Sequence, residues 1–101
     1  MKHSDQEKHI KRFKRFLELR HAGKVAKELN ISHAAMYLSI QETKQLLACY
    51  LYVHNREYES PYKHLRHIKL TKQEFLQYKI FWFALIKEFL QWRKKHIKDR
   101  K

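Results

Sequence analysis

The sequence predicts a mainly α-helical fold, a winged helix-turn-helix with a short two-stranded wing and a long C-terminal dimerisation helix. Glycine and proline occur once each, so few residues interrupt long helices. Residues 25–54 follow the pattern of two helices around a tight turn that lead into a strand. Residues 80–86 are apolar on every face of a helix, which one packing surface cannot cover.

Length and charge set the scale of the molecule. The 101 residues predict one compact body with a winged helix-turn-helix at 1–70 and a helix with a basic tail at 71–101. Lysine and arginine number 23 against 10 acidic residues, and the resulting net charge of +13 attracts polyanions. This excess does not by itself distinguish DNA from RNA or from an anionic membrane surface.

Cysteine content and hydropathy indicate the compartment. The single Cys49 excludes an intrachain disulfide and is typical of a reducing environment. The N-terminus is polar where a signal peptide is apolar, and the longest apolar run has seven residues. A membrane span needs about 20 such residues. We therefore expect a cytoplasmic, nucleoid-associated protein without membrane contact.

A capping signal marks the first helix. Ser4 and Glu7 form an S-x-x-E capping box, in which each side chain accepts a hydrogen bond from the other residue's backbone amide. The apolar residues that follow recur at helical spacing and predict a helix over 5–20. Ala22 and Gly23 are expected to end it.

Two further helices are predicted around a turn. A short helix at 24–29 precedes a turn at 30–32, and Ser32 is the expected N-cap of a third helix that reaches about residue 47. The side chains of the short helix that are expected to point inward are Val25, Ala26 and Leu29. The narrow apolar stripe of the third helix, which is expected to face the core, is Met36, Ile40, Thr43 and Leu47.

The row beside that stripe is left uncovered. Helices that enter a DNA major groove read bases through their early turns, so side chains near the start of the third helix are candidates for base contact. The base-reading candidates are Ser32, His33, Ala34, Tyr37, Leu38 and Gln41. The alternative interpretation is a solvated polar face.

The pattern changes after the third helix. Residues 49–53 and 65–70 favour two short strands, and the hydrophilic connection at 54–64 holds the only proline. This arrangement predicts a wing, in which cations commonly lie beside the DNA backbone. The phosphate-binding candidates in and near the wing are Lys24, Lys44, Lys63, Arg66 and Lys69.

The last helix carries more apolar surface than one stripe. Thr71 and Glu74 repeat the capping box and open a helix to about residue 98. The stripe expected to pack on the first helix is Leu76, Ile80, Phe83 and Leu90. The remaining residues, expected at a dimer interface, are Phe75, Trp82, Leu85, Ile86, Phe89 and Trp92. The alternative is that these aromatic residues form the core of a monomer.

The order of these elements resembles the N-terminal winged helix-turn-helix of LysR-type transcriptional regulators, over about residues 13–75. In that family an alanine precedes the turn, an aliphatic residue and a serine lie in it, and an isoleucine follows in the reading helix. The matching residues here are Ala26, Leu29, Ile31, Ser32 and Ile40. Residues 47–52 and 70–71 are similar to the family's entry into the wing and to its strand-to-helix junction.

The resemblance implies DNA contact at the start of the reading helix and dimerisation through the helix after the wing. The implied contact positions are His33, Ala34, Tyr37 and Leu38. The family usually has glutamine, proline, serine and arginine there, so the base contacts should differ. The sequence does not contain the family's large effector-binding domain, so ligand sensing of that kind is not implied.

Catalysis, metal binding and cofactors are not expected. The sequence lacks a glycine-rich phosphate loop, and Cys49 falls in a predicted strand where a buried structural thiol is expected. His64 and His67 have no cysteine or carboxylate cluster that would complete a zinc site.

The sequence thus predicts a sequence-specific, double-stranded DNA-binding transcriptional regulator of bacterial, phage or plasmid type that acts as a homodimer. One alternative is a protein-interaction module that docks a larger regulator through the aromatic C-terminal helix. Another is a nucleoid protein or RNA-binding protein without a defined site, although no aromatic β-sheet platform for single-stranded RNA is evident.

Overall fold

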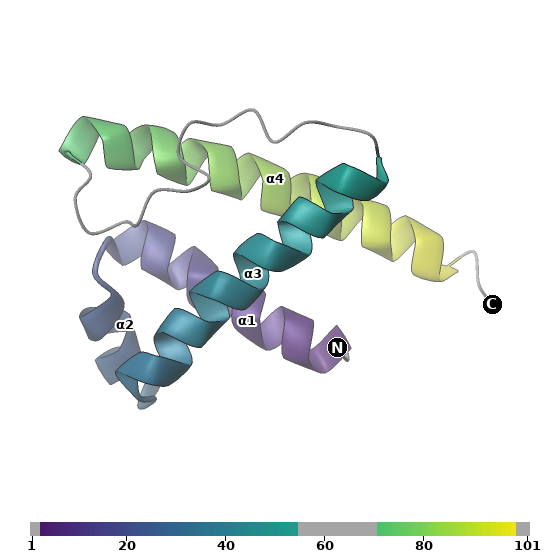
Figure 1. Cartoon of the computed structure of the whole chain (residues 1–101). Coiled ribbons are helices and arrows are strands. Elements are labelled where there is room, and N and C mark those ends of the chain that lie inside the picture. The colour runs from purple at the N-terminus through teal and green to yellow at the C-terminus, as the bar shows by residue number, and fades with distance from the viewer. Residues whose placement is uncertain (1–2, 55–70, 99–101) are drawn as a thin grey trace. The chain divides into compact units, whose positions relative to one another are not determined.

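The computed structural model describes residues 3–54 and 71–98, and every regular element in those ranges is an α-helix (Figure 1). The four helices are α1 (His3–Leu19), α2 (Ala22–Leu29), α3 (His33–Val53) and α4 (Lys72–Lys98). The chain divides into two compact units, Met1–Ala48 and Cys49–Lys101. The helix α3 crosses this division without a break (Figure 1).

The predicted wing is wrong in the part that the structure describes. Residues 49–53, expected as a strand, are the last turns of α3. Tyr50 and Leu51 are buried and follow Leu47 at three and four residues, so the apolar stripe of the helix continues. The Tyr50 ring also packs edge-on against Phe89 and Trp92 of α4. Helical packing thus outweighs the strand propensity of these side chains.

The rest of the predicted wing, the strand at 65–70 and the connection from residue 55, lies outside the described residues. Across 3–54 and 71–98 the structure contains no strand, so in these ranges an all-helical arrangement stands in place of the predicted winged helix-turn-helix.

The junction between α1 and α2 also differs from the expectation. α1 ends at Leu19, and Arg20 takes a left-handed conformation with φ of 59°. Ala22 and Gly23, expected to end the first helix, instead begin α2. The backbone amide of Lys24 donates to Nδ1 of His21 over 3.1 Å, so this imidazole caps α2. A histidine is an unusual N-cap, which explains why the sequence pattern placed the helix start later.

The connection between α2 and α3 has the predicted length. Asn30 adopts a left-handed conformation with φ of 56°, and the amide of Ile31 donates to the Ala26 carbonyl over 2.9 Å. This closing pattern is a Schellman-type helix end. The Ser32 hydroxyl then accepts from the Ala35 amide over 3.0 Å, which confirms Ser32 as the N-cap of α3.

Unit 1 has a core formed by the apolar faces of α1, α2 and α3. The stripe predicted for the third helix, Met36, Ile40, Thr43 and Leu47, is buried as expected. From α1 and α2 the core receives Ile10, Phe13, Phe16, Leu17, Ala22, Val25 and Ala26. Leu29, expected inward, is 41% exposed.

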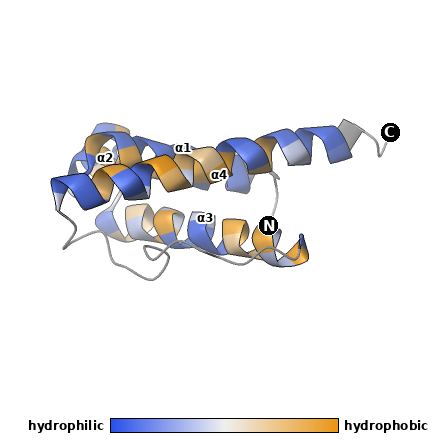
Figure 2. Cartoon of the chain, turned by 90° about the horizontal axis from the view of Figure 1, so that it is seen from above, coloured by the Kyte–Doolittle hydropathy of each residue, from blue (hydrophilic) through white to orange (hydrophobic). Residues whose placement is uncertain are grey.

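The start of α4 follows the predicted capping box. The Glu74 amide donates to Oγ1 of Thr71 over 3.1 Å, and the Thr71 amide donates to Oε1 of Glu74 over 3.0 Å. The amide of Thr71 stabilises the carboxylate and lowers the pKa of Glu74. Figure 2 shows hydrophobic residues in the middle of α4 and hydrophilic residues toward its C-terminal end.

Candidate nucleic-acid interface

The start of α3 presents an exposed row opposite its buried stripe. Tyr37 and Leu38 are 43% and 49% exposed, while Met36 between the turn and these residues is fully buried. The other predicted base-reading residues, Ser32, His33, Ala34 and Gln41, are exposed as well. This end of α3 therefore carries tyrosine, histidine, glutamine and aliphatic side chains at exposed positions.

Two features shape the surroundings of the first turn of this row. The Ser32 hydroxyl oxygen accepts a hydrogen bond from the Ala35 amide and caps α3. A Cβ placed on Gly23 would lie 3.3 Å from Cε1 of His33 and 3.1 Å from Cε1 of His21. The starts of α2 and α3 thus approach closely, and glycine leaves room for the two imidazoles.

The predicted phosphate-binding residues fall in different environments. Lys24 is exposed in the first turn of α2. Lys44 is half-buried, and burial lowers its pKa to about 8. A desolvated ammonium group is poorly placed to meet a phosphate from solution. Lys63, Arg66 and Lys69 lie outside the described residues.

Sequence reasoning missed a polar cluster inside unit 1. Ser39 is fully buried, and its Oγ lies 2.8 Å from Nδ1 of His9, with the choice of donor set by the imidazole tautomer. Nη1 of Arg12 donates to the same hydroxyl over 3.2 Å, and the Thr43 hydroxyl donates to the Ser39 carbonyl over 2.8 Å. The only signal in the sequence was the serine and threonine four residues apart beside the apolar stripe.

This cluster joins α1 to the helix that carries the exposed row. Burial, together with the charges of Lys8 and Arg12, lowers the pKa of His9 and so favours the neutral imidazole. A serine beside a histidine has the form of a nucleophile and its base. Ser39 has no exposed surface, however, so no substrate reaches its hydroxyl. The cluster positions α3 and does not form a reactive site.

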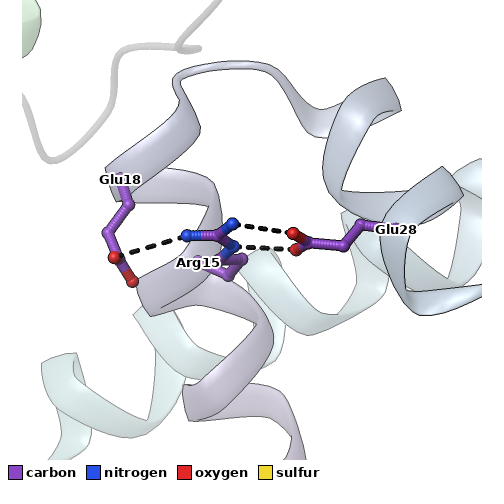
Figure 3. A network of polar contacts seen from close by, with 3 residues as sticks. All are labelled: Arg15, Glu18 and Glu28. Carbon is purple, nitrogen blue, oxygen red and sulfur yellow. Dashed lines mark hydrogen bonds and ion pairs between the residues drawn. The ribbon is translucent and has the colours of Figure 1, made fainter.

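α1 and α2 are joined by a bidentate ion pair on the surface (Figure 3). Nε and Nη2 of Arg15 each donate to a carboxylate oxygen of Glu28 over 2.7 Å. Nη1 of Arg15 also reaches Glu18 at 3.5 Å. Arg15 holds the pKa of the Glu28 carboxyl below its usual value through these hydrogen bonds.

The six α4 residues predicted at a dimer interface are buried or partly buried within the single chain. Five of them, Phe75, Trp82, Leu85, Ile86 and Phe89, are at most 5% exposed, and Trp92 is partly exposed. Leu76 and Ile80, which were expected to face the first helix, are 50% and 54% exposed. The buried and exposed faces of α4 are therefore the reverse of the expectation at these positions.

Unit 2 has an aromatic cluster that the strand prediction concealed. The Tyr50 hydroxyl donates to Oε2 of Glu88 over 2.8 Å. The Trp92 ring packs against two imidazoles, with ring centroids 5.1 Å from His54 and 4.7 Å from His96. These contacts fasten the end of α3 to the second half of α4.

Other candidate chemistry is sparse. Cys49 is exposed in α3 and not, as expected, a buried thiol of a strand. Within 3–54 and 71–98, no three histidine, cysteine or acidic side chains gather closely enough to hold a metal ion. His64 and His67 lie outside the described residues. Among the described helices, none combines the length and apolar character needed to cross a membrane.

Comparison with known proteins identifies no relative of the chain. The chain matches no family model, no curated protein and no solved structure.

Proposed function

We propose that the chain binds double-stranded DNA at a specific sequence and regulates transcription, with the first turns of α3 as the base-reading segment. The observation that carries this proposal is the exposed row of Tyr37 and Leu38 on a helix whose opposite stripe is buried. The row follows directly after a short turn between two helices. A net charge of +13 supplies the sequence-independent attraction to phosphate.

The side chains of the row suit contact with base edges. The Tyr37 hydroxyl and the His33 imidazole donate or accept hydrogen bonds, and the Gln41 amide does both. Ala34 and Leu38 are apolar and match thymine methyl groups. The resemblance of the sequence of α2 and α3 to the reading head of LysR-type regulators supports the same proposal.

The test is selection of binding sites from a random duplex pool, followed by titration of the winners at two salt concentrations. A sequence-specific regulator should prefer its selected site over bulk DNA by about a thousandfold or more. Equal affinity for all duplexes would reject sequence specificity and favour a general nucleoid protein.

The role of the row is tested by Tyr37→Ala with Tyr52→Ala as the matched control. Tyr52 is 83% exposed near the opposite end of the same helix. Loss of a base contact should cost about 1–3 kcal/mol on the selected site and little on random DNA. Tyr52→Ala should leave both affinities unchanged. Equal losses on both DNAs would remove Tyr37 from the base-reading set.

A second copy of the chain is the other partner in this proposal. Leu76 and Ile80 are half-exposed one turn apart on α4, and such apolar pairs favour helix association. A homodimer would bind a two-fold symmetric site. We expect sedimentation to show a concentration-dependent dimer that Leu76→Ser with Ile80→Ser reduces. A monomer at all concentrations would contradict dimerisation while leaving DNA binding to its own test.

A further inference from the structure

Unit 1 has an open groove of about 770 Å³ along α1, beside α2 and the turn that follows it. Its lining includes the aliphatic side chains of Leu29, which is 41% exposed, and Ile31, which is partly exposed. Neither side chain belongs to the core of the unit. The groove therefore leaves aliphatic surface in water next to the turn that precedes α3.

The residues that line the groove carry charges of both signs. Lys8, Lys11 and Lys14 recur every three residues on one face of α1, a rise of about 4.5 Å per step. Lys8 contacts Asp5 at 3.8 Å, whereas no hydrogen bond or ion pair within the described residues engages Lys11 or Lys14. The groove also contains the carboxylates Glu7, Glu18 and Glu28.

The two arginines that line the groove already form hydrogen bonds within the chain. Arg15 is held by the bidentate pair with Glu28, and Arg12 donates to Ser39 in the core. The ammonium groups of Lys11 and Lys14 are consequently the cations that remain for a ligand. They line the same groove as Leu29 and Ile31, so the groove combines cations with aliphatic surface.

We propose that this groove binds an acidic amphipathic helix of a partner protein. Leucine-type side chains of that helix cover Leu29 and Ile31, and its carboxylates, spaced one turn apart, meet Lys11 and Lys14. The occupant is a protein because the apolar side chains of Leu29 and Ile31 need apolar side chains against them, which the phosphate backbone of a nucleic acid does not supply.

The occupant is also a different chain. A second copy carries the same net charge of +13. Its acidic residues are scattered, and every segment that contains one also carries lysine or arginine. No stretch of this sequence has the acidic, amphipathic pattern that the groove would complement. The proposal is independent of DNA binding, because the groove residues are distinct from the exposed row of α3.

The experiment is a ¹⁵N-detected NMR titration of the full chain with a synthetic acidic peptide. The peptide has about 16 residues, roughly four helical turns, with leucines on one face and glutamates on the others. The control peptide has the same composition in an order that scatters the leucines. We expect the ordered peptide to bind at least about tenfold more tightly and to shift the amides around Lys11, Leu29 and Ile31.

Charge reversal locates the site. Lys11→Glu with Lys14→Glu should weaken peptide binding about tenfold or more. The matched control, Lys94→Glu with Lys95→Glu, makes the same change in net charge at exposed positions of α4 and should have little effect. Leu29→Ser, a change at an exposed position, should weaken binding while preserving the fold.

Three outcomes would overturn the proposal. These are equal binding of the ordered and scrambled peptides, equal effects of the two charge reversals, and shifts confined to residues away from the groove. Adding the selected DNA duplex separates this proposal from the previous one. If DNA shifts the same groove amides, the groove is a nucleic-acid surface and the protein-docking proposal fails. Failure of DNA to bind at all would leave the peptide result standing.

Discussion

At the scale of single residues, burial changes the chemistry of a few side chains in a protein covered with cations. Burial, with the charges of Lys8 and Arg12, lowers the pKa of His9, and its imidazole meets the hydroxyl of Ser39. Lys44 is half-buried with a pKa of about 8. These positions resemble exposed ones in the sequence, and only burial in the folded chain distinguishes them.

Removing the Ser39 hydroxyl should destabilise the protein. Ser39→Ala leaves His9 and Arg12 without the oxygen that they share, and an unsatisfied buried polar group costs about 1–3 kcal/mol. Urea denaturation measures the free energy of unfolding. In the double variant His9→Leu with Ser39→Ala, we expect a loss smaller than the sum of the single losses. Strict additivity would show that the two side chains are not coupled.

Protonation of His9 should also destabilise the protein in mild acid. The pKa of His9 is lower in the folded chain than the 6.5 of an unfolded one, so the unfolded chain binds more protons. The free energy of unfolding should therefore fall as the pH drops below about 6.5, until it reaches the folded pKa. His9→Gln should reduce this fall, and His33→Gln at an exposed position should retain it. The same pH profile in wild type and His9→Gln would contradict the assignment.

At the scale of helices, the starts of α3 and α4 follow local rules, whereas the buried face of α4 does not. Ser32, Thr71 and Glu74 cap their helices through hydrogen bonds within four residues, which any environment permits. By contrast, the sequence pattern of α4 offers several apolar stripes of similar quality. Which stripe is buried depends on what packs against it.

The cap of α3 can be tested separately from DNA binding. Ser32→Ala removes the oxygen that accepts the Ala35 amide and should lower the free energy of unfolding by about 1 kcal/mol. Ser32→Asp keeps an acceptor at the cap and should retain most of the stability. If the alanine and aspartate variants are equally destabilised, the hydroxyl does not act as a cap.

At the scale of the whole molecule, a large excess of positive charge is spread over two compact units joined by the continuous helix α3. Such an excess raises affinity for every nucleic acid and makes it depend on salt. In the proposed DNA complex, sequence preference would come from the side chains that reach base edges. The two contributions are therefore separable by measuring affinity against salt concentration.

Lys24→Gln tests the charge contribution. Lys24 is exposed at the start of α2, and loss of one phosphate contact should reduce the slope of log K against log salt by about one. The reduction should be the same on selected and random DNA. Lys87→Gln, an exposed control on α4, should leave the slope unchanged. An unchanged slope in Lys24→Gln would remove this lysine from the interface.

The sequence was sufficient for features that depend on near neighbours. The turn at 30–32, the caps at Ser32 and Thr71, and the core stripe from Met36 to Leu47 were all predicted and are confirmed. Each involves residues within a few positions of one another or one strict helical period. The exposure of Tyr37 and Leu38 followed from the same period, since they lie away from that stripe.

Tertiary structure decided what depends on distant partners. Residues 49–53 extend α3 because Tyr50 packs on Phe89 and Trp92, although their side chains favour strands when considered alone. Ser39 binds a histidine 30 positions earlier in the chain, which no local pattern encodes. The buried face of α4 was likewise undetermined by periodicity. Local hydrogen bonds place the helix ends, whereas long-range burial selects which surfaces become core.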